Sequence, residues 1–322
     1  MNARTDTDAA AGFDAPAPVL SYSPVVLHVP GRPVDLQVRV SAPAAGTGLP
    51  VILLSHGHGG SNNLSSLNGY APLAQLWAAA GFVVIQPTHL SSGTLRRHLA
   101  GTAGGPFFIR SRAQDMSHVL DRLDEIEKTV PQLAGRIDHD KIAVAGHSLG
   151  GHTAALLLGA RSADPETGQE VNLTEPRITT GVLLAAPGRG GDVLNGWMAD
   201  KVPFLHDTDF STMTTPALVV VGDQDDSRHF TDVGPDWHAD PYRLSPAPKT
   251  LLTLFGGEHL LGGISGYDAD ETTDENPERV AALARLTSAY LRTRFRPGDP
   301  AWQSACEALT TGAGASGRVE SK

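Results

Sequence analysis

Short apolar runs alternate with amphipathic segments along most of the chain. Residues 25–29 and 34–40 alternate apolar and polar positions around the turn sequence PGRP, which predicts an antiparallel hairpin. Six later runs are continuously apolar and predict strands at 51–54, 82–86, 141–146, 181–185, 217–222 and 251–255. Uninterrupted apolar strands are typical of a sheet that is buried on both faces, and such sheets are mostly parallel.

Segments with helical periodicity lie between these strands, where crossover connections are needed. Segment 111–130 carries an apolar face and ends before Pro131, while segment 276–295 begins with Asn276 as a cap and Pro277 at the first helical position. The alternation of strand and helix predicts an α/β fold with a mostly parallel central sheet of about eight strands, flanked by helices on both faces.

Length and composition favour a single domain. The 322 residues are 40% hydrophobic and 19% charged, as in a compact globular protein. The polar, aperiodic ends predict disordered tails at 1–21 and 311–322 around one domain at 22–310. Segments 90–108 and 188–213 fit no regular element and follow predicted strands, so they are expected to form a lid or pocket walls.

Charge and cysteine content narrow the classes of partner. The net charge of −10 would repel nucleic acid and anionic lipid, which favours a small neutral or cationic ligand. No apolar stretch approaches the ~18 residues that span a bilayer, so stable membrane insertion is not expected. The N-terminus lacks the pattern of a secretory signal, which predicts a cytoplasmic protein. Cys306 is the single cysteine and excludes an intramolecular disulfide; the oligomeric state is left open.

The clearest chemical motif is the sequence GHSLG at residues 146–150, between a predicted strand and a helix-forming segment. A Gly-x-Ser-x-Gly sequence in this context is the pattern of a nucleophile elbow, whereas the same residues alone could be an ordinary glycine-rich bend. At such an elbow the N–H of Leu149 would face a developing oxyanion. Ser148 is therefore the candidate nucleophile.

A nucleophilic serine needs a base, and the base needs a group that orients it. Where the nucleophile lies on such an elbow, the triad residues come along the chain in the order Ser, acid, His, so both partners are expected after Ser148. His259 comes directly after the last predicted strand and is the candidate base. Asp223, Asp225 and Asp226 follow the strand before it and are the candidate acids. Their pattern does not choose among them, because aspartates in turns often cap helices.

Other polar residues receive simpler interpretations. His229 and His238 lie in a polar loop and are expected at the surface. His56 and His58 form a His-x-His pair, but no Cys, Asp or Glu nearby completes a zinc site, so neither metal nor cofactor is predicted. The turn that holds this pair is expected to give the oxyanion a second N–H. The acidic segment 267–276 lacks the spacing of a calcium loop and is expected to be solvated.

Four stretches resemble the α/β-hydrolase superfamily, and more narrowly the group of platelet-activating factor acetylhydrolases, dienelactone hydrolases and chlorophyllases. They are LLSHGHGGS, similar to the oxyanion loop of the acetylhydrolases, AAAGFVVIQPTH, similar to the next strand, RAQDMSHVLDRL, similar to the helix before the elbow, and AGHSLGGHTA, similar to the elbow. The resemblance covers residues 25–294. It departs from dienelactone hydrolases, whose nucleophile is a cysteine, and from related secreted polyesterases, which have signal peptides and disulfides.

The resemblance implies a serine esterase that cleaves short- to medium-chain, lipid-like or polyester-like carboxylic esters through an acyl-enzyme, without cofactor or metal. It implies that the backbone N–H groups of His58 and Leu149 form the oxyanion hole. It also implies that Asp225, three residues after the glycine that ends its strand, is the catalytic acid.

The specificity of such an esterase would be set by the two segments without regular structure. Their candidate pocket residues are Phe107, Phe108, Trp197 and Phe204, although ordinary packing explains them equally well. Two alternatives stay open. The same triad serves acyl transfer, amide cleavage or perhydrolysis, and a non-catalytic ligand-binding protein can retain the fold. The intact Ser, acid, His order argues against the second alternative.

Overall fold

The computed structural model describes residues 17–99, 101–164, 167–311 and 316–322, and nine strands of these residues form one central sheet. In spatial order the strands are β1 (Val19–Leu27), β2 (Leu36–Pro43), β4 (Val83–Pro87), β3 (Leu49–Ser55), β5 (Ile137–His147), β8 (Thr180–Leu184), β9 (Ala217–Gly222), β10 (Lys249–Leu254) and β11 (Gly317–Ser321). A separate pair consists of β6 (Arg161–Ala163) and β7 (Glu170–Asn172).

The six central strands β4, β3, β5, β8, β9 and β10 are parallel to one another, which confirms the prediction of a mostly parallel sheet. They correspond to the six continuously apolar runs. The predicted hairpin is β1 and β2, an antiparallel pair that joins the sheet through β4. Because parallel strands all end at the same edge, the loops after β3, β5, β9 and β10 come together there.

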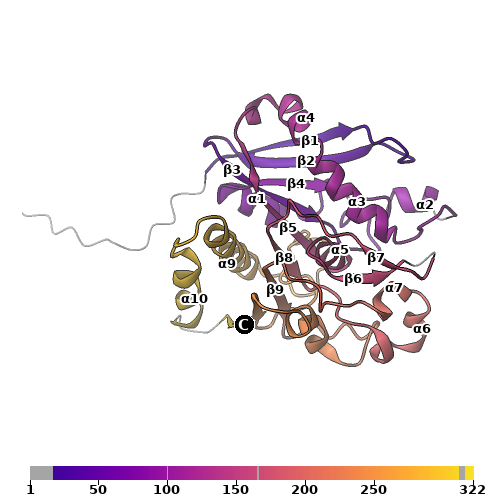
Figure 1. The fold of residues 1–322 in the computed structure, drawn as a ribbon. Coiled ribbons are helices and arrows are strands. Elements are labelled where there is room, and N and C mark those ends of the chain that lie inside the picture. The colour runs from indigo at the N-terminus through magenta and orange to yellow at the C-terminus, as the bar shows by residue number, and fades with distance from the viewer. Residues whose placement is uncertain (1–16, 100, 165–166, 312–315) are drawn as a thin grey trace, which may run out of the picture.

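Helices cover both faces of the sheet (Figure 1). They are α1 (Ala71–Ala79), α2 (Leu95–Leu99), α3 (Ile109–Leu120), α4 (Leu123–Thr129), α5 (Leu149–Leu157), α6 (Gly196–Ala199), α7 (Pro203–His206), α8 (Asp240–Arg243), α9 (Pro277–Phe295) and α10 (Ala301–Thr311), with short 3-10 turns η1 (Pro131–Leu133), η2 (Gly191–Val193) and η3 (Gly234–Ala239). The helix predicted at 111–130 is divided into α3 and α4. The break after Leu120 keeps the apolar side chains of both helices in one core.

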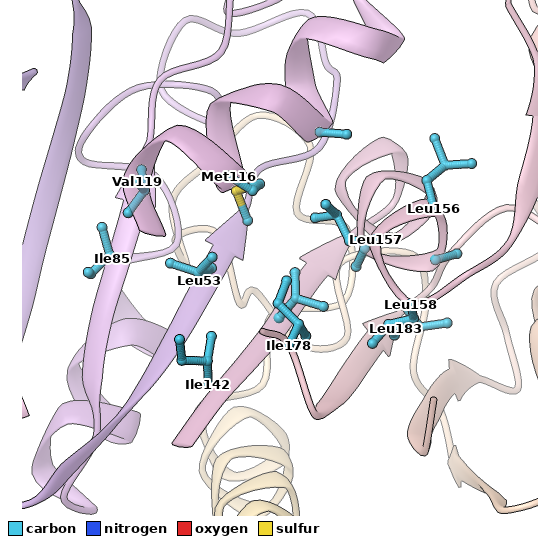
Figure 2. Packing of buried hydrophobic residues seen from close by; sticks show 14 of the residues in the cluster. Leu53, Ile85, Met116, Val119, Ile142, Leu156, Leu157, Leu158, Ile178 and Leu183 are labelled. Atoms are coloured by element: carbon cyan, nitrogen blue, oxygen red, sulfur yellow. The ribbon is translucent and has the colours of Figure 1, made fainter. Parts of the chain in front are cut away.

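Neighbouring positions of β3 point to opposite faces of the sheet and enter different cores. Leu53 belongs to one buried cluster with Met116 of α3 and Leu157 of α5 (Figure 2). Ile52 belongs to a second cluster with Trp77 of α1 and the apolar face of α9. Burial of each such side chain contributes about 2 kcal/mol of transfer free energy. This two-sided burial explains the continuous apolar runs in the sequence.

The predicted tails differ from the structure at both ends. The first strand already begins at Val19, and residues 1–16 lie outside the described residues. At the C-terminus, Thr311 still belongs to α10, and Gly317–Ser321 forms the edge strand β11, antiparallel to β10. Val319 packs against the core and is the one apolar residue of that strand, which is why no strand pattern was visible. Among the described residues, no helix has the length and apolar character that crossing a membrane requires.

Candidate active site

Ser148 stands where β5 turns sharply into α5. Its backbone has φ 53° and ψ −122°, a conformation that residues with a side chain rarely adopt. The Ser148 N–H donates to the carbonyl of Leu184 in β8 at 2.9 Å, and the Ser148 carbonyl accepts from the His152 N–H of α5 at 3.1 Å. The unfavourable backbone is therefore held from the sheet on one side and from the helix on the other.

The two glycines of the motif are required by close contacts between backbone segments. A Cβ at position 146 would lie 1.9 Å from the carbonyl oxygen of Gly150. A Cβ at position 150 would lie 2.0 Å from the carbonyl oxygen of Ser55 at the end of β3. Any side chain at either position would push α5 away from the sheet and move Ser148 with it.

Ser148, His259 and Asp225 form a continuous chain of hydrogen-bonded side chains. His259 Nε2 lies 2.9 Å from Ser148 Oγ, and His259 Nδ1 lies 2.8 Å from Asp225 Oδ2. Of the other two candidate acids, Asp226 pairs with Arg228 at 2.7 Å, and Asp223 accepts the N–H of Gly256 at 2.7 Å. Of the three candidate acids, Asp225 is therefore the one that contacts the imidazole of His259.

The Asp225 carboxylate is buried and surrounded by hydrogen-bonding groups. Its side chain accepts from Ser227 Oγ at 2.8 Å, and its Oδ2 lies 3.2 Å from Nε2 of His238 as well as next to His259. Burial alone would raise the pKa of Asp225, but the imidazoles of His259 and His238 hold that pKa well below its usual range. The carboxylate therefore stays ionised at every pH at which an imidazole can accept a proton.

The expectation that His238 lies at the surface is wrong. Its ring is buried in η3, with Nδ1 2.9 Å from the carbonyl oxygen of Ala186 and Nε2 2.9 Å from Ser227 Oγ. The apolar neighbour Trp237, which is also buried, was the signal that could have indicated burial. His229 is exposed, as predicted.

Sequence reasoning also missed the part played by His147. Its Nε2 lies 2.8 Å from the carbonyl oxygen of His259, so Nε2 carries the proton and Nδ1 accepts from the Tyr70 hydroxyl at 2.7 Å. The same hydroxyl accepts the N–H of Gly57 at 3.0 Å. Burial above all lowers the pKa of His147 to about 3, which keeps this ring neutral. His147 thereby ties the loop after β3 to the loop that carries His259.

His56 and His58 have separate environments. His56 Nδ1 lies 2.7 Å from the carbonyl oxygen of Gly57, and His56 Nε2 accepts the N–H of His89 at 3.2 Å, so both ring nitrogens are engaged by backbone groups. His58 lines the cavity beside Ser148, and Nη1 of Arg96 lies 2.6 Å from its Nε2. Burial, followed by the charge of Arg96, lowers the pKa of His58 to about 4.

Among the described residues, two groups of three side chains bring together atoms of the kinds that bind metal ions. Asp225, His238 and His259 bring such atoms within 4.8 Å of one another. Asp225 Oδ2 lies 2.8 Å from His259 Nδ1 and 3.2 Å from His238 Nε2, and His259 is also hydrogen-bonded to Ser148. The second group consists of Asp124 and Glu127 of α4 and His139 of β5, and its three side chains are exposed or half-buried.

The acidic segment 267–276 is not simply solvated, contrary to expectation. Glu271 accepts the backbone N–H and the hydroxyl of Ser61, both at 2.8 Å. Asp274 accepts the N–H groups of Glu258 and Gly262 at 2.8 Å and 2.9 Å, and its side chain is 5% exposed. These carboxylates fix the loop after β3 and both ends of the segment that carries His259.

A cavity of about 880 Å³ opens beside the Ser148 side chain. The predicted pocket residues Phe107, Trp197 and Phe204 line it. Phe108 was expected there too, but it is buried against a separate cavity of about 390 Å³. Consecutive side chains leave the chain in different directions, so one phenylalanine faces each cavity. The candidate oxyanion residues, His58 and Leu149, both line the cavity that holds Ser148.

The segments expected to be irregular contain short helices. Segment 90–108 includes α2, and segment 188–213 includes η2, α6 and α7. The three α-helices have four or five residues each and η2 has three, too short for a helical period to be visible in the sequence. Both segments contribute to the wall of the cavity, as expected, through residues that include Arg96, Phe107, Met198 and Val202.

Comparison with known protein families and curated sequences identified no relative of this chain. No protein-family model matches the chain, and a search of curated proteins finds no significantly similar sequence.

We expect the protein to lose stability as the pH falls below 6.5. Burial lowers the pKa of His147 and His152 to about 3 and lowers the pKa of His56 and His89 strongly. Between these values and 6.5 the unfolded chain binds more protons, so the free energy of unfolding falls by up to about 1.4 kcal/mol per histidine per pH unit. Asp115, whose pKa burial raises to about 6, acts in the opposite direction below that pH.

Thermal unfolding at a series of pH values from 8 to 5 tests this expectation. The Tm should be nearly constant above pH 7.5 and should fall by several degrees per unit below about 6.5. His152→Gln removes one buried imidazole and should make the fall shallower. A Tm that does not change between pH 7 and pH 5 would contradict the prediction.

Proposed function

We propose that this protein is a serine hydrolase that cleaves carboxylic esters through an acyl-enzyme. The observation that carries the proposal is the chain of hydrogen bonds from Ser148 through His259 to the buried Asp225, beside a largely apolar cavity. A serine, a histidine and a carboxylate in this order of contact are the parts needed to activate a hydroxyl at neutral pH.

We also propose that the fold belongs to the α/β-hydrolase superfamily. In support, the candidate nucleophile follows β5 in a turn with positive φ, the acid follows β9, and the histidine follows β10, all at the carboxyl edge of a mostly parallel sheet. This arrangement agrees with the chain order and the strand–turn–helix context of that superfamily.

In the first half of the proposed reaction, Ser148 Oγ attacks the carbonyl carbon of the ester. His259 Nε2 takes the hydroxyl proton, and the resulting imidazolium is stabilised by the ionised Asp225. When the tetrahedral intermediate collapses, the bond to the alcohol oxygen breaks and His259 returns the proton to that oxygen. The acyl group then remains on Ser148 as an ester.

In the second half, water takes the place of the alcohol. His259 Nε2 removes a proton from water as its oxygen attacks the acyl carbon, and it then protonates Ser148 Oγ as the carboxylic acid leaves. The side chain of His259 is 29% exposed, so water and substrate can reach the imidazole from the cavity.

The negative oxygen formed in both halves needs hydrogen-bond donors. The N–H of Leu149, at the first turn of α5, has no acceptor within its own helix and profits from the positive end of the helix dipole. We assign the second donor to the N–H of His58. Each donor contributes about 3 kcal/mol to the reduction of the barrier.

The proposed substrates are neutral esters with short to medium acyl chains. The cavity wall carries apolar side chains that bind such a chain, and Val202 and Leu205 are the aliphatic ones next to Phe204. We expect kcat/KM for p-nitrophenyl esters to rise from acetate to hexanoate, by up to about 4-fold for each added methylene. Measuring initial rates along this series tests both the activity and the pocket.

A substitution that fills the cavity sharpens that test. Val202→Phe should lower kcat/KM for hexanoate by at least about 10-fold and leave acetate turnover within about 2-fold, because the longer chain would clash. The control is Val193→Phe on the 39% exposed Val193 of η2. No turnover of any ester would contradict the proposed function. Turnover without dependence on chain length would contradict the assignment of the pocket.

A further inference from the structure

The most unusual buried side chain outside the triad is Arg112 of α3, which is fully buried. Its guanidinium donates from Nε to Thr153 Oγ1 at 2.9 Å and from Nη1 to Ser91 Oγ at 2.6 Å. Nη2 donates to Ser55 Oγ at 3.1 Å and to the carbonyl oxygen of His56. All four of these acceptors are uncharged.

A buried carboxylate on the same helix is already bound by other groups. Asp115 lies one turn further along α3 and accepts from Arg32 Nε at 2.9 Å, and its Oδ2 lies 2.9 Å from His89 Nδ1. Burial lowers the pKa of Arg112 to about 9, so the guanidinium is charged at neutral pH. The two buried guanidinium groups and one carboxylate therefore leave an excess of positive charge, which is costly in a low-dielectric interior.

Three of the four acceptors of Arg112 belong to the two segments that carry the proposed oxyanion donors, and the fourth, Ser91, lies in the loop after β4. The His56 carbonyl lies two residues before His58, in the loop after β3. Thr153 in turn donates its hydroxyl to the carbonyl of Leu149 at 3.1 Å. One rigid guanidinium thus joins the His58 segment to the first turn of α5, and its fork geometry fixes their relative position.

We propose that Arg112 is a positioning residue of the oxyanion hole, and that its charge is balanced only when the negative oxygen forms during the reaction. This inference rests on the proposed esterase function. The ester carbonyl is neutral in the ground state and negative in the tetrahedral intermediate. A buried positive charge that is hydrogen-bonded to both segments of the hole therefore stabilises the intermediate more than the bound substrate. The effect should appear in kcat rather than in KM.

The test uses Arg112→Met, which keeps length but removes charge and donors, and Arg112→Lys, which keeps the charge without the fork. We expect kcat for p-nitrophenyl butyrate to fall about 100- to 1,000-fold in Arg112→Met and about 10-fold in Arg112→Lys, with KM changed less than about 3-fold. The control is Arg110→Met on the same helix, where Arg110 is half-exposed and pairs with Asp164. Its kcat should stay within about 2-fold of the wild type.

A second measurement separates the oxyanion hole from a general loss of structure. Phenylboronic acid binds to an active serine as a negatively charged tetrahedral adduct, so its inhibition constant should rise in Arg112→Met in parallel with the loss of kcat. Inhibition by butanol, a neutral ligand that can occupy the apolar cavity, should be unchanged, because butanol forms no negative oxygen. A loss of both kinds of binding, or an increase in KM at unchanged kcat, would overturn the inference.

The remaining outcomes also test the role of Arg112 and separate it from the esterase proposal. If Arg112→Met does not fold, the soluble Arg112→Lys variant carries the test, and wild-type kcat in that variant would overturn the inference. If both variants fold and keep the activity and boronate affinity of the Arg110→Met control, Arg112 has no such role, while the esterase proposal stands. If the wild type itself neither hydrolyses esters nor binds the boronate, the proposed function fails first.

Discussion

Replacing Ser148 by alanine is expected to lower kcat for ester hydrolysis by about 10,000- to 1,000,000-fold while the protein stays folded. The serine hydroxyl is the only group of the proposed triad that forms a bond to the substrate. Without it, the remaining groups offer only binding and polarisation of the carbonyl. The methyl group of alanine fits the same backbone, because the strained conformation of Ser148 is held by hydrogen bonds of its N–H and carbonyl.

The measurement combines turnover of p-nitrophenyl acetate and butyrate with covalent labelling. A fluorophosphonate reacts with an activated serine, so the wild type should gain one adduct by mass spectrometry and Ser148→Ala should gain none. Ser304→Ala, an exposed serine in α10 far along the chain from the elbow, is the matched control and should keep full activity and labelling. A Tm within a few degrees of the wild type shows that the fold is preserved.

Two results would contradict the assignment of Ser148. Full turnover in Ser148→Ala would mean that another group attacks the ester or that the measured activity comes from a contaminant. Labelling of the wild type on a different serine would place the activated hydroxyl elsewhere. Either result would remove the basis for the roles given to His259 and Asp225.

The central sheet was predictable because its strands are buried on both faces. Each parallel strand must be apolar at every position, and such runs stand out in a sequence. The edge strand β11 was not predictable for the opposite reason: only Val319 of its five residues packs on the core, so its sequence is that of a polar tail. The short helices of the cavity wall were missed because four or five residues show no helical period.

The candidate triad could be predicted in part. The backbone geometry at Ser148 requires glycines on both sides, and that requirement leaves a pattern in the sequence. His259 was indicated by its position after a buried strand. The choice of Asp225 over its neighbours depends on where each side chain points in one turn, which the residues themselves do not encode and which the resemblance to hydrolases supplied.

The groups that support the site left no local pattern because their partners are distant in the sequence. Tyr70 is hydrogen-bonded to His147, which is 77 residues away in the sequence, and Ser61 is hydrogen-bonded to Glu271, which is 210 residues away. Arg112 belongs to an amphipathic helix in which an arginine would ordinarily be placed on the exposed face. Such contacts are created by the packing of the sheet and helices, so they become visible only when the fold is known.

Replacing Asp225 by asparagine is expected to lower kcat by about 10,000-fold with little change in KM. With the carboxylate present, His259 keeps its proton on Nδ1 and leaves Nε2 free to accept the proton of Ser148. The amide group of asparagine can donate to Nδ1, which moves the imidazole proton to Nε2 and removes the base. The positive charge that forms on His259 also loses its partner in a buried environment.

Neighbouring aspartates provide the matched controls for this substitution. Asp226→Asn should keep kcat within about 2-fold, because the Asp226 side chain is 47% exposed and its ion pair with Arg228 lies at the surface. Asp223→Asn should also keep kcat, since an amide oxygen can still accept the N–H of Gly256. Equal losses in all three variants would mean that the negative charge of the turn as a whole matters. A large loss in Asp226→Asn alone would place a different carboxylate on His259 during the reaction. If Asp225→Asn alone loses activity, the hydrogen bond between Asp225 and His259 is the interaction that makes the imidazole a base.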